Sequence, residues 1–560
     1  MSVKWPQMIL RQRSDLVIGL LIFVASASLY ILLRTQQYLV EDAIRCLSVY
    51  WQGRPTTAGN NHLLCLVNVF AWTKMLSLAG VNATNPFDFM RIAHWMTAIA
   101  AAACISMFWL LCRRATGSIG IALAATCAYG FSNAFLVHAT STAEPMTGLF
   151  WTFASIAMVA WGLSVSSRLR LFVGGALLLL AMANYESMVL IGPAELVLIY
   201  YWDELPGYHG RTFALWFLAG CLFGGIAAYV PAYALSGTTH PLAMWHRFVE
   251  MGGEQQVFGG FAASKLINLP VGFSNSILSS LPLHYQGVRA SLAMHSHDRW
   301  ILLTSIAILM LLGWLVWTLR RLRFVWPELE RRQRLILTCC AVAIGLEVFP
   351  LIFWEPIYNK LWLQPLAVIF FAWSLIFTAW RRHYPGRLMF VPEALLLAVV
   401  LGAGFTSAFA ASRSPMPCLG AARQLSETLR PTDLLVGEWD PVSLLYASFW
   451  GDGAKRFDLP GIAGENGPRT PTLLDDEILR VRNSGGRVYA LGVVDMPEAN
   501  WNLFLQSRCR LPYSSLAEIR RCAKPVEHLV CGEGDEVLWQ VSLDCYKPQN
   551  PSGNLMTTKP

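Results

Sequence analysis

Long apolar runs separated by short polar segments fill the first 412 residues of the chain. A membrane-spanning helix needs about 20 apolar residues, and nine runs come close to that length. They are 16–33, 92–112, 117–138, 145–163, 212–235, 300–319, 335–353, 361–380 and 390–411. Two shorter runs, 171–184 and 187–202, flank Asn184, Tyr185 and Glu186 and predict thin or kinked helices. The pattern therefore predicts eleven spans.

The start of the chain carries basic residues before its first apolar run, as a signal peptide does. The run is longer than a signal-peptide core, however, and no small-residue cleavage site follows it. We therefore expect residues 16–33 to be an uncleaved membrane anchor.

The amino-acid composition also indicates a membrane protein. The 560 residues are 55% hydrophobic and 14% charged, with a mean hydropathy of +0.44, which is typical of a polytopic membrane protein. The net charge of +8 comes largely from loops between apolar runs. It therefore reports on topology and anionic lipid. Because no basic stripe with interleaved aromatic residues occurs in a soluble segment, we exclude nucleic acid as a partner.

Orientation follows from the basic loops, because loops rich in Lys and Arg stay cytoplasmic. The basic loops contain Arg113 and Arg114, Arg168 and Arg170, Arg211, the cluster 320–334, and Arg381, Arg382 and Arg387. They predict a multi-pass protein of the inner (plasma) membrane with a cytoplasmic N-terminus. The apolar segment 62–80 cannot be a full span in this scheme. We therefore expect one external loop, 35–90, that carries a surface-lying or re-entrant helix, and a second external loop at 236–299.

The composition changes near residue 413, where charge, Gly and Pro increase and long apolar runs end. Short apolar strands at 433–437 and 487–491 alternate with helical stretches near 419–429, 441–448 and 472–483, which predicts an α/β domain with a partly parallel sheet. We expect this periplasmic or extracellular domain to span 413–546, followed by a disordered tail, 547–560. No zinc-site spacing or Gly-rich phosphate loop occurs there.

Five cysteines fall in this domain: Cys418, Cys509, Cys522, Cys531 and Cys545. Disulfides form in oxidising compartments, so an external domain predicts one or two structural bridges with one thiol left over.

Glu41 and Asp42 are adjacent acids just outside the first span. Carboxylates near lipid are costly and usually have a chemical task. The external segments 142–145 and 354–360, which contain Glu144 and Lys360, face the same compartment in this scheme. The alternative is structural, since acids also cap a helix N-terminus, here one beginning near Ala43.

The order of these features resembles the GT-C-fold glycosyltransferases, which include protein O-mannosyltransferases and lipid A aminoarabinose transferases. The resemblance covers roughly residues 10–410. The matching residues are Glu41, Asp42 and Arg45 in the first loop, Asn61-His62-Leu63-Leu64 at the start of the loop helix, Arg91 before the next span, and Ala143-Glu144-Pro145. The resemblance implies a GT-C-like membrane domain, 1–412, whose partners are a polyprenyl-phosphate-linked sugar donor, a protein, lipid or glycan acceptor, and the bilayer.

The implied reaction needs a base and fixed cations. Asp42 or Glu41 would take the proton of the acceptor hydroxyl, and we favour Asp42. Arg45, Arg91 and Lys360 would stabilise the leaving phosphate, and one displacement would invert the anomeric carbon. His62, Glu144 and Glu186 complete the candidate substrate-binding residues. No cofactor is required, although Asp42 and Glu144 are suitable ligands for a divalent ion.

Each candidate also has a structural interpretation. Arg45 is close enough on its helix to pair with Glu41, and Glu144 before Pro145 fits a helix start. His62 fits an interfacial residue, Glu186 a helix junction, and Lys360 a side chain that snorkels.

Two other functions compete with a transferase. A transporter or flippase predicts ionisable residues at mid-span, and Glu347 fits that pattern. A non-catalytic assembly protein would use the C-terminal domain to bind a partner.

Overall fold

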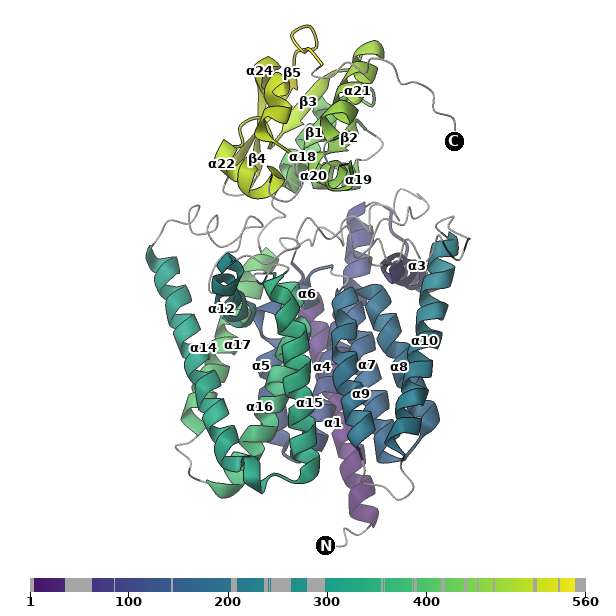
Figure 1. The fold of residues 1–560 in the computed structure, drawn as a ribbon, viewed down its shortest axis with the longest axis vertical. Helices are drawn as coiled ribbons and strands as arrows, with labels where there is room; N and C mark the ends of the chain where they lie inside the picture. Colours follow the sequence, from purple (N-terminus) through teal and green to yellow (C-terminus); the bar gives the residue numbers. More distant parts are fainter. Residues whose placement is uncertain are drawn as a thin grey trace. The chain divides into compact units, whose positions relative to one another are not determined.

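The computed structural model of the protein divides into two compact units, a helical unit and an α/β domain (Figure 1). The helical unit contains the described residues up to 413, and the α/β domain contains those from 418 onward. The structure describes residues 5–35, 63–84, 86–142, 145–202, 209–235, 240, 242, 263–278, 298–353, 356, 358–384, 386, 390–413, 418–437, 441–450, 453–466, 469–506, 511–531 and 534–548.

Helices form nearly all the secondary structure of the helical unit. In chain order they are α1 (Trp5–Leu32), α3 (Leu63–Leu78), α4 (Pro86–Thr116), α5 (Ile119–Gly130), α6 (Asn133–Thr140), α7 (Pro145–Ser164), α8 (Arg168–Asn184), η1 (Glu186–Ile191), α9 (Gly192–Tyr201), α10 (Gly210–Leu235), α12 (Ala263–Leu278), α14 (Asp298–Val325), η3 (Trp326–Glu328), α15 (Arg331–Val348), η4 (Phe349–Ile352), η5 (Asn359–Trp362), α16 (Leu363–His383) and α17 (Val391–Arg413). The predicted class, a polytopic helical membrane protein with a C-terminal α/β domain, is confirmed.

Eight of the described helices are long and apolar enough to cross a membrane, or nine if the bent pair α5–α6 is one span. The remaining two predicted spans correspond to α8, which has 17 residues, and to the η1–α9 pair. Both are short for a bilayer of about 30 Å, since a helix rises about 1.5 Å per residue. Eleven spans therefore stay a prediction.

The run 117–138, predicted as one span, is instead two helices that meet at an angle of 66°. The bend follows Gly130, where an added Cβ would lie 3.1 Å from Ile105 and 3.2 Å from the Tyr30 hydroxyl. After it, the Ser132 hydroxyl donates to the Tyr129 carbonyl at 2.6 Å. Close packing and a side-chain hydrogen bond thus replace a regular helical turn, and an apolar pattern does not encode either one.

Small residues allow α8 and α10 to pack closely. A Cβ on Gly220 would clash with the Phe172 carbonyl oxygen, and one on Gly224 would clash with the Ala176 carbonyl oxygen. Two glycines four residues apart let helix backbones approach each other in a membrane, where dispersion rather than the hydrophobic effect holds helices together.

Two helices, α3 and α12, are drawn nearly end-on in Figure 1, whereas the long helices of the unit run vertically. The Trp72 indole of α3 donates to the Ile92 carbonyl near the start of α4 at 2.7 Å. The Asn133 amide of α6 donates to the Asn275 carbonyl of α12 at 2.9 Å. Both crossing helices are therefore fixed to the same end of the long helices.

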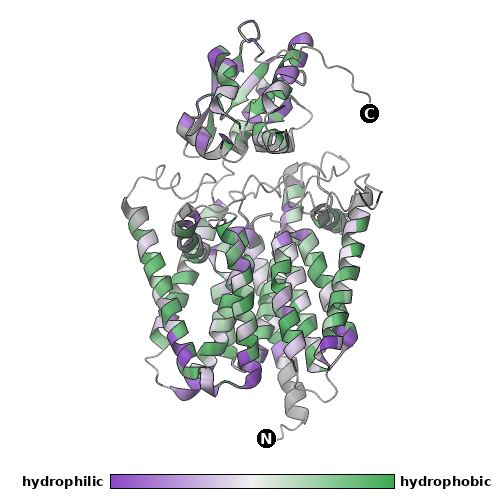
Figure 2. Ribbon diagram, in the orientation of Figure 1, coloured by the Kyte–Doolittle hydropathy of each residue, from purple (hydrophilic) through white to green (hydrophobic). Residues whose placement is uncertain are grey.

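The opposite end of the helical unit, which we call the arginine end, holds the basic turns. It contains Arg113 of α4, Arg170 of α8, Arg321 of α14 and Arg381 of α16. Hydrophilic residues are frequent at this end, while the middle of the long helices is hydrophobic (Figure 2). Most of these arginines contact a partner there: Arg113 Nε lies 3.0 Å from Asp15 Oδ1, and the Arg170 guanidinium lies 3.6 Å from the Trp161 ring centroid.

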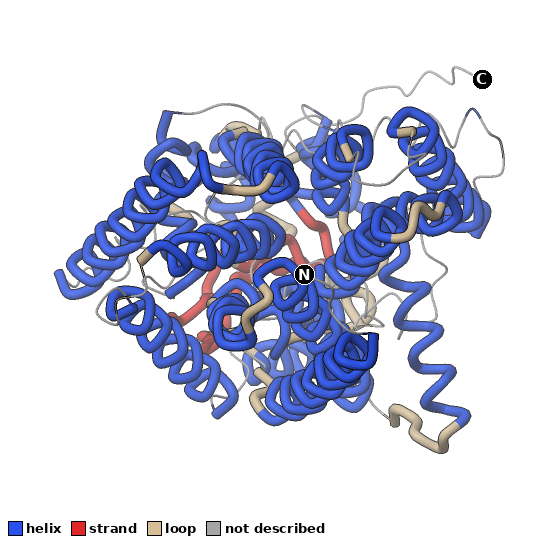
Figure 3. Tube along the Cα trace, turned by 90° about the horizontal axis from the view of Figure 1, so that it is seen from below, coloured by secondary structure: helices blue, strands red, loops and turns tan. Residues whose placement is uncertain are grey.

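The strands form one small group (Figure 3), a five-stranded sheet of order β2-β1-β3-β5-β4. β1 pairs in parallel with β2 and β3, while β5 pairs antiparallel with β3 and β4. The predicted, partly parallel sheet is confirmed. The elements are α18 (Leu419–Thr428), β1 (Leu434–Gly437), α19 (Pro441–Phe449), β2 (Lys455–Asp458), α20 (Leu459–Asn466), α21 (Thr470–Asn483), β3 (Val488–Leu491), α22 (Glu498–Trp501), η8 (Asn502–Gln506), η9 (Tyr513–Leu516), α24 (Ala517–Cys522), β4 (Ala523–Cys531) and β5 (Gly534–Val541).

Two disulfides close this domain, Cys418–Cys531 and Cys522–Cys545. They confirm the prediction of structural bridges. Cys509, the thiol left over, lies outside the described residues.

Candidate functional site

The ends of α1, α6 and α17 meet at one place, which we call the α6 end. The Thr35 amide donates to the Thr140 carbonyl at 2.8 Å, and the Thr35 hydroxyl donates to the Ala411 carbonyl at 3.3 Å. Thr35 is the last described residue before the loop that contains Glu41 and Asp42. The described chain therefore reaches the last residue of α6 directly before the segment that contains the two acids.

The first polar cluster at this end surrounds His138, which is 2% exposed in the last turn of the short helix α6. His138 Nε2 lies 3.2 Å from Asn359 Oδ1. Because an amide oxygen only accepts, the imidazole donates in this pair. The next residue, Lys360, places its ammonium 5.7 Å from the Tyr185 ring centroid and within electrostatic range of His138. Glu186 follows Tyr185 directly.

The second cluster consists of two arginines, Arg34 and Arg91. Burial, and after it the positive charge of Arg91, lowers the pKa of the Arg34 guanidinium. Arg91 also pairs with Asp88 at 3.0 Å, one turn earlier in α4. His94, one turn further along α4, is buried near Arg34 and the Ala139 carbonyl.

The last turn of α6 lies between the two clusters. Three consecutive residues make the connections: His138 contacts Asn359, Ala139 faces His94, and Thr140 binds the Thr35 amide. The chain then continues to Thr142, whose hydroxyl donates to the Met90 carbonyl at 3.3 Å. Arg34, Arg91 and Lys360 thus each lie next in the chain to a residue that contacts α6 or Thr142 just after it.

Helix α3 is anchored beside the first cluster. The Asn68 amide donates to Asn184 Oδ1, and the Thr147 hydroxyl donates to the same oxygen at 3.2 Å. Asn184 is the last residue of α8, directly before Tyr185 and Glu186. Because Asn184 also donates to the Leu180 carbonyl at 2.7 Å, its orientation is fixed.

Three of the eight predicted site residues are described: Arg91, Glu186 and Lys360. All three lie at the α6 end, with Lys360 and Glu186 on either side of Tyr185 in the first cluster and Arg91 in the second. The other five, Glu41, Asp42, Arg45, His62 and Glu144, lie outside the described residues.

Sequence reasoning missed Arg34, His94, His138 and Asn359 as site residues. Arg34 directly follows an apolar span, and the two histidines lie within apolar runs. A polar side chain in or beside an apolar run was therefore the signal that could have identified these residues. Such residues are also common as packed core groups, and only their convergence from separate helices distinguishes them. Across the described ranges, no group of three or more His, Cys, Asp or Glu side chains is arranged to hold a metal ion.

No family model matches the chain, and no curated protein matches it. The solved structures similar to it include two crystal structures of ArnT from Cupriavidus metallidurans. The one bound to undecaprenyl phosphate is 14% identical over 98% of this chain and 100% of that chain, with a TM-score of 0.41. The apo structure is 13% identical over 95% of this chain and 99% of that chain, with a TM-score of 0.45. Likeness at this level does not decide the activity of the chain.

Proposed function

We propose that the protein is a membrane glycosyltransferase that takes a sugar from a polyprenyl-phosphate carrier and transfers it at the α6 end. One observation carries the proposal: Arg34, Arg91 and Lys360 each lie next in the chain to a residue that hydrogen-bonds to α6 or to Thr142 just after it. Two near guanidinium groups repel one another. An anion bound between the clusters would relieve this repulsion, which is why the arrangement suits a phosphate.

The cations would act on the leaving group. As the sugar leaves, negative charge grows on the carrier phosphate, and fixed positive groups stabilise that charge more in the transition state than in the bound donor. Lys360 and Arg34 are the described residues best suited to this role, because both are partly buried beside histidines of α4 and α6. Arg45 would add a third cation.

The base would be Asp42 or Glu41, with Asp42 favoured. A carboxylate within hydrogen-bond reach of the acceptor hydroxyl takes its proton during attack on the anomeric carbon. One displacement of this kind inverts that carbon and needs no covalent intermediate. Glu144 and Glu186 would position the sugar, with His62 beside them. The scheme requires no metal, and Asp42 with Glu144 are the residues that would hold a divalent ion.

The reaction would take place on the outer side of the inner membrane. Both disulfides of the α/β domain favour an oxidising compartment for it, and α17 leads to this domain from the α6 end. The basic turns of the arginine end favour the cytoplasm for the opposite end. The prenyl tail of the carrier would enter between helices from the bilayer, and the acceptor would be a protein, lipid or glycan.

The decisive experiment compares polyprenyl-linked sugars and cell-envelope glycans in cells with the gene, without it, and with the Asp42→Asn or Glu41→Gln variant. We expect the deletion to accumulate one lipid-linked sugar and to lose one glycan decoration. Asp42→Asn should reproduce the deletion at normal protein level, since removal of a general base costs about 10²–10⁴-fold in rate. Full decoration in both carboxamide variants would refute the assignment of the base.

A flippase is the second candidate, because Glu347 is a carboxylate only 3% exposed within α15. Buried ionisable groups in spans often mark transport paths. The same cells separate the two functions. Loss of a flippase traps the lipid-linked sugar on the cytoplasmic leaflet, whereas loss of a transferase lets it accumulate on the outer leaflet.

A further inference from the structure

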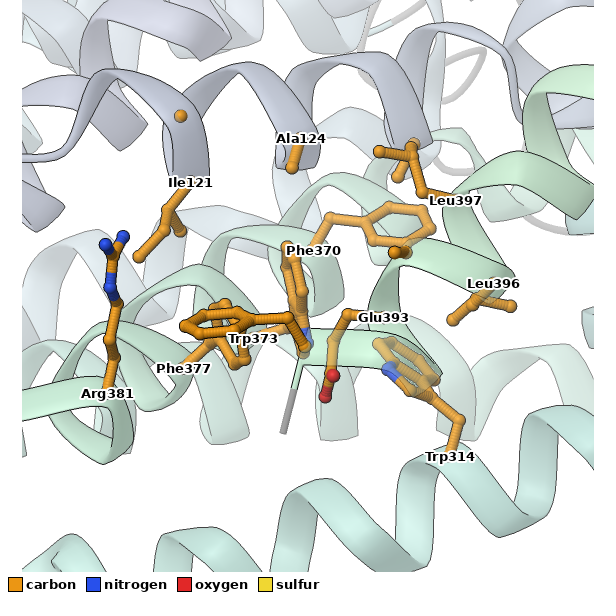
Figure 4. A pocket seen from close by; sticks show the side chains of 14 residues that line it. Ile121, Ala124, Trp314, Phe370, Trp373, Phe377, Arg381, Glu393, Leu396 and Leu397 are labelled. Carbon is orange, nitrogen blue, oxygen red and sulfur yellow. The ribbon is translucent and has the colours of Figure 1, made fainter. Parts of the chain in front are cut away.

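A pocket of about 230 Å³ lies between α5, α14, α16 and α17, in the half of the helical unit near the arginine end (Figure 4). Its lining is almost entirely apolar, with Phe370, Trp373 and Phe377 of α16 forming one wall. Gly120 and Ala394, which also line it, are exposed. The pocket therefore opens on the outer surface of the helical unit, which faces lipid in a membrane protein.

The pocket is a preformed space with rigid walls. Trp373 stacks on Phe377 with ring centroids 5.3 Å apart, and Phe377 packs edge-on against Phe390 at 5.5 Å. The ring centroids of Trp314 and Trp373 lie 6.5 Å apart. These rings hold one another in place and cannot fill the gap. An added Cβ on Gly120 meets no atom within 4 Å.

Three charged side chains lie at or next to the pocket: the oppositely charged pair Glu393 and Arg321, and the cation Arg381. Glu393 pairs with Arg321, and their side chains are 6% and 2% exposed, so the charges compensate each other. Arg381 pairs with no carboxylate of the described residues, and its guanidinium lies 5.3 Å from the Phe390 ring centroid. Figure 4 places Arg381 and Ile121 at one end, and Trp314 and Leu396 at the other.

A site with one exposed cation at the end of an apolar slot matches an anionic amphiphile. A phosphate group pairs well with a guanidinium. The apolar walls of the pocket suit a hydrocarbon chain, which needs no hydrogen bonds. Arg382 and His383 share the last turn of α16 with Arg381, and such basic turns attract the anionic lipids of the cytoplasmic leaflet.

We propose that this pocket binds one acyl chain of an anionic membrane phospholipid, whose phosphate pairs with Arg381. The bound chain fills the space between α14 and α17, which the Arg321–Glu393 pair otherwise joins. This site is separate from the α6 end and does not depend on the proposed transferase activity.

The test uses the purified full chain in lipid nanodiscs that contain phosphatidylglycerol with a photoreactive diazirine on one acyl chain. Light-induced crosslinks are mapped by peptide mass spectrometry. We expect crosslinks on pocket residues of α5, α16 and α17, and their loss in Gly120→Leu, which fills the pocket. Gly402→Leu is the matched control: Gly402 also lies in open space but not in the pocket, so crosslinks should persist.

A second arm tests the headgroup and uses only exposed side chains, so it is independent of any folding defect of Gly120→Leu. Arg381→Gln should remove the preference for phosphatidylglycerol over phosphatidylcholine, while Arg382→Gln should keep it. Crosslinks that survive Gly120→Leu would overturn the proposal. So would an unchanged headgroup preference in Arg381→Gln, or displacement of the crosslinked lipid by undecaprenyl phosphate at low mole fraction.

Discussion

The two ends of the helical unit hold their charges in different ways. At the arginine end, most of the cations named above have a partner: Arg321 pairs with Glu393, Arg113 with Asp15, and Arg170 stacks on Trp161. At the α6 end, Arg91 pairs with Asp88, yet its positive charge still lowers the pKa of the Arg34 guanidinium, and Lys360 acts on His138 in the same sense. Matched charges stabilise a fold without any ligand, whereas gathered like charges lower stability unless something binds there. The α6 end is therefore the better candidate for the reaction site.

We expect the largest effect on stability from a substitution that breaks the buried pair of Arg321 and Glu393. Glu393→Gln removes the carboxylate that pairs with the buried Arg321 guanidinium, and we expect a loss of about 3–5 kcal/mol of stability. The measurement is unfolding of the purified protein in detergent by a denaturant titration. Replacing both residues together with leucine should recover most of the loss, because the uncompensated charge is then absent. A stable single variant would show that the pair is not structural.

A smaller effect, on the transfer rate, is expected from a substitution at the α6 end. Lys360→Met should lower transfer by about ten- to a hundred-fold, since a hydrogen bond to a charged group contributes roughly 1.5–3 kcal/mol. Stability should hardly change, because the lysine is only partly buried. The readout is the rate of loss of the lipid-linked sugar in membranes that contain equal amounts of each variant.

Lys74→Met is the matched control for Lys360. Lys74 of α3 also lies over an aromatic ring, 5.6 Å from the Phe70 centroid, but it is exposed and contacts neither cluster. Equal losses of transfer in both variants would mean that general positive charge, and not the position of Lys360, matters.

The smallest effect belongs to Arg170, a half-buried cation whose ring partner Trp161 is exposed. Its stacking on Trp161 contributes about 0.5–1 kcal/mol, so Arg170→Ala should lower stability by no more than that and leave transfer unchanged. Thermal unfolding in the same detergent measures the first, and the membrane assay measures the second. A large loss of transfer in this variant would contradict the division between the two ends.

Much of the architecture could be predicted from the pattern of the chain. The strands at 433–437 and 487–491 became β1 and β3, and the helical stretch 472–483 became most of α21. Period and turn residues act locally, so they are readable in one sequence. The strands β4 and β5 were missed, because β4 is mostly exposed and lacks a buried apolar face.

The candidate site was only partly predictable. Lys360 and Glu186 were singled out from position and charge, but their common neighbour Tyr185 was not. His138 and Asn359 are 221 residues apart in the chain, and Thr35 and Ala411 are 376 apart. No local pattern specifies such pairs, since they depend on how whole helices pack.

The sequence by itself determined the membrane class, the basic loops, the C-terminal α/β domain and its bridging cysteines, because hydropathy, charge and Cys content act residue by residue. Only the tertiary structure decided that the run 117–138 bends by 66° and that its second half, α6, carries His138 into contact with Asn359 in the first cluster. The reason is physical: the bend depends on contacts of Gly130 with Ile105 and Tyr30, side chains from two other helices. Contacts of that kind exist only once the helices have packed.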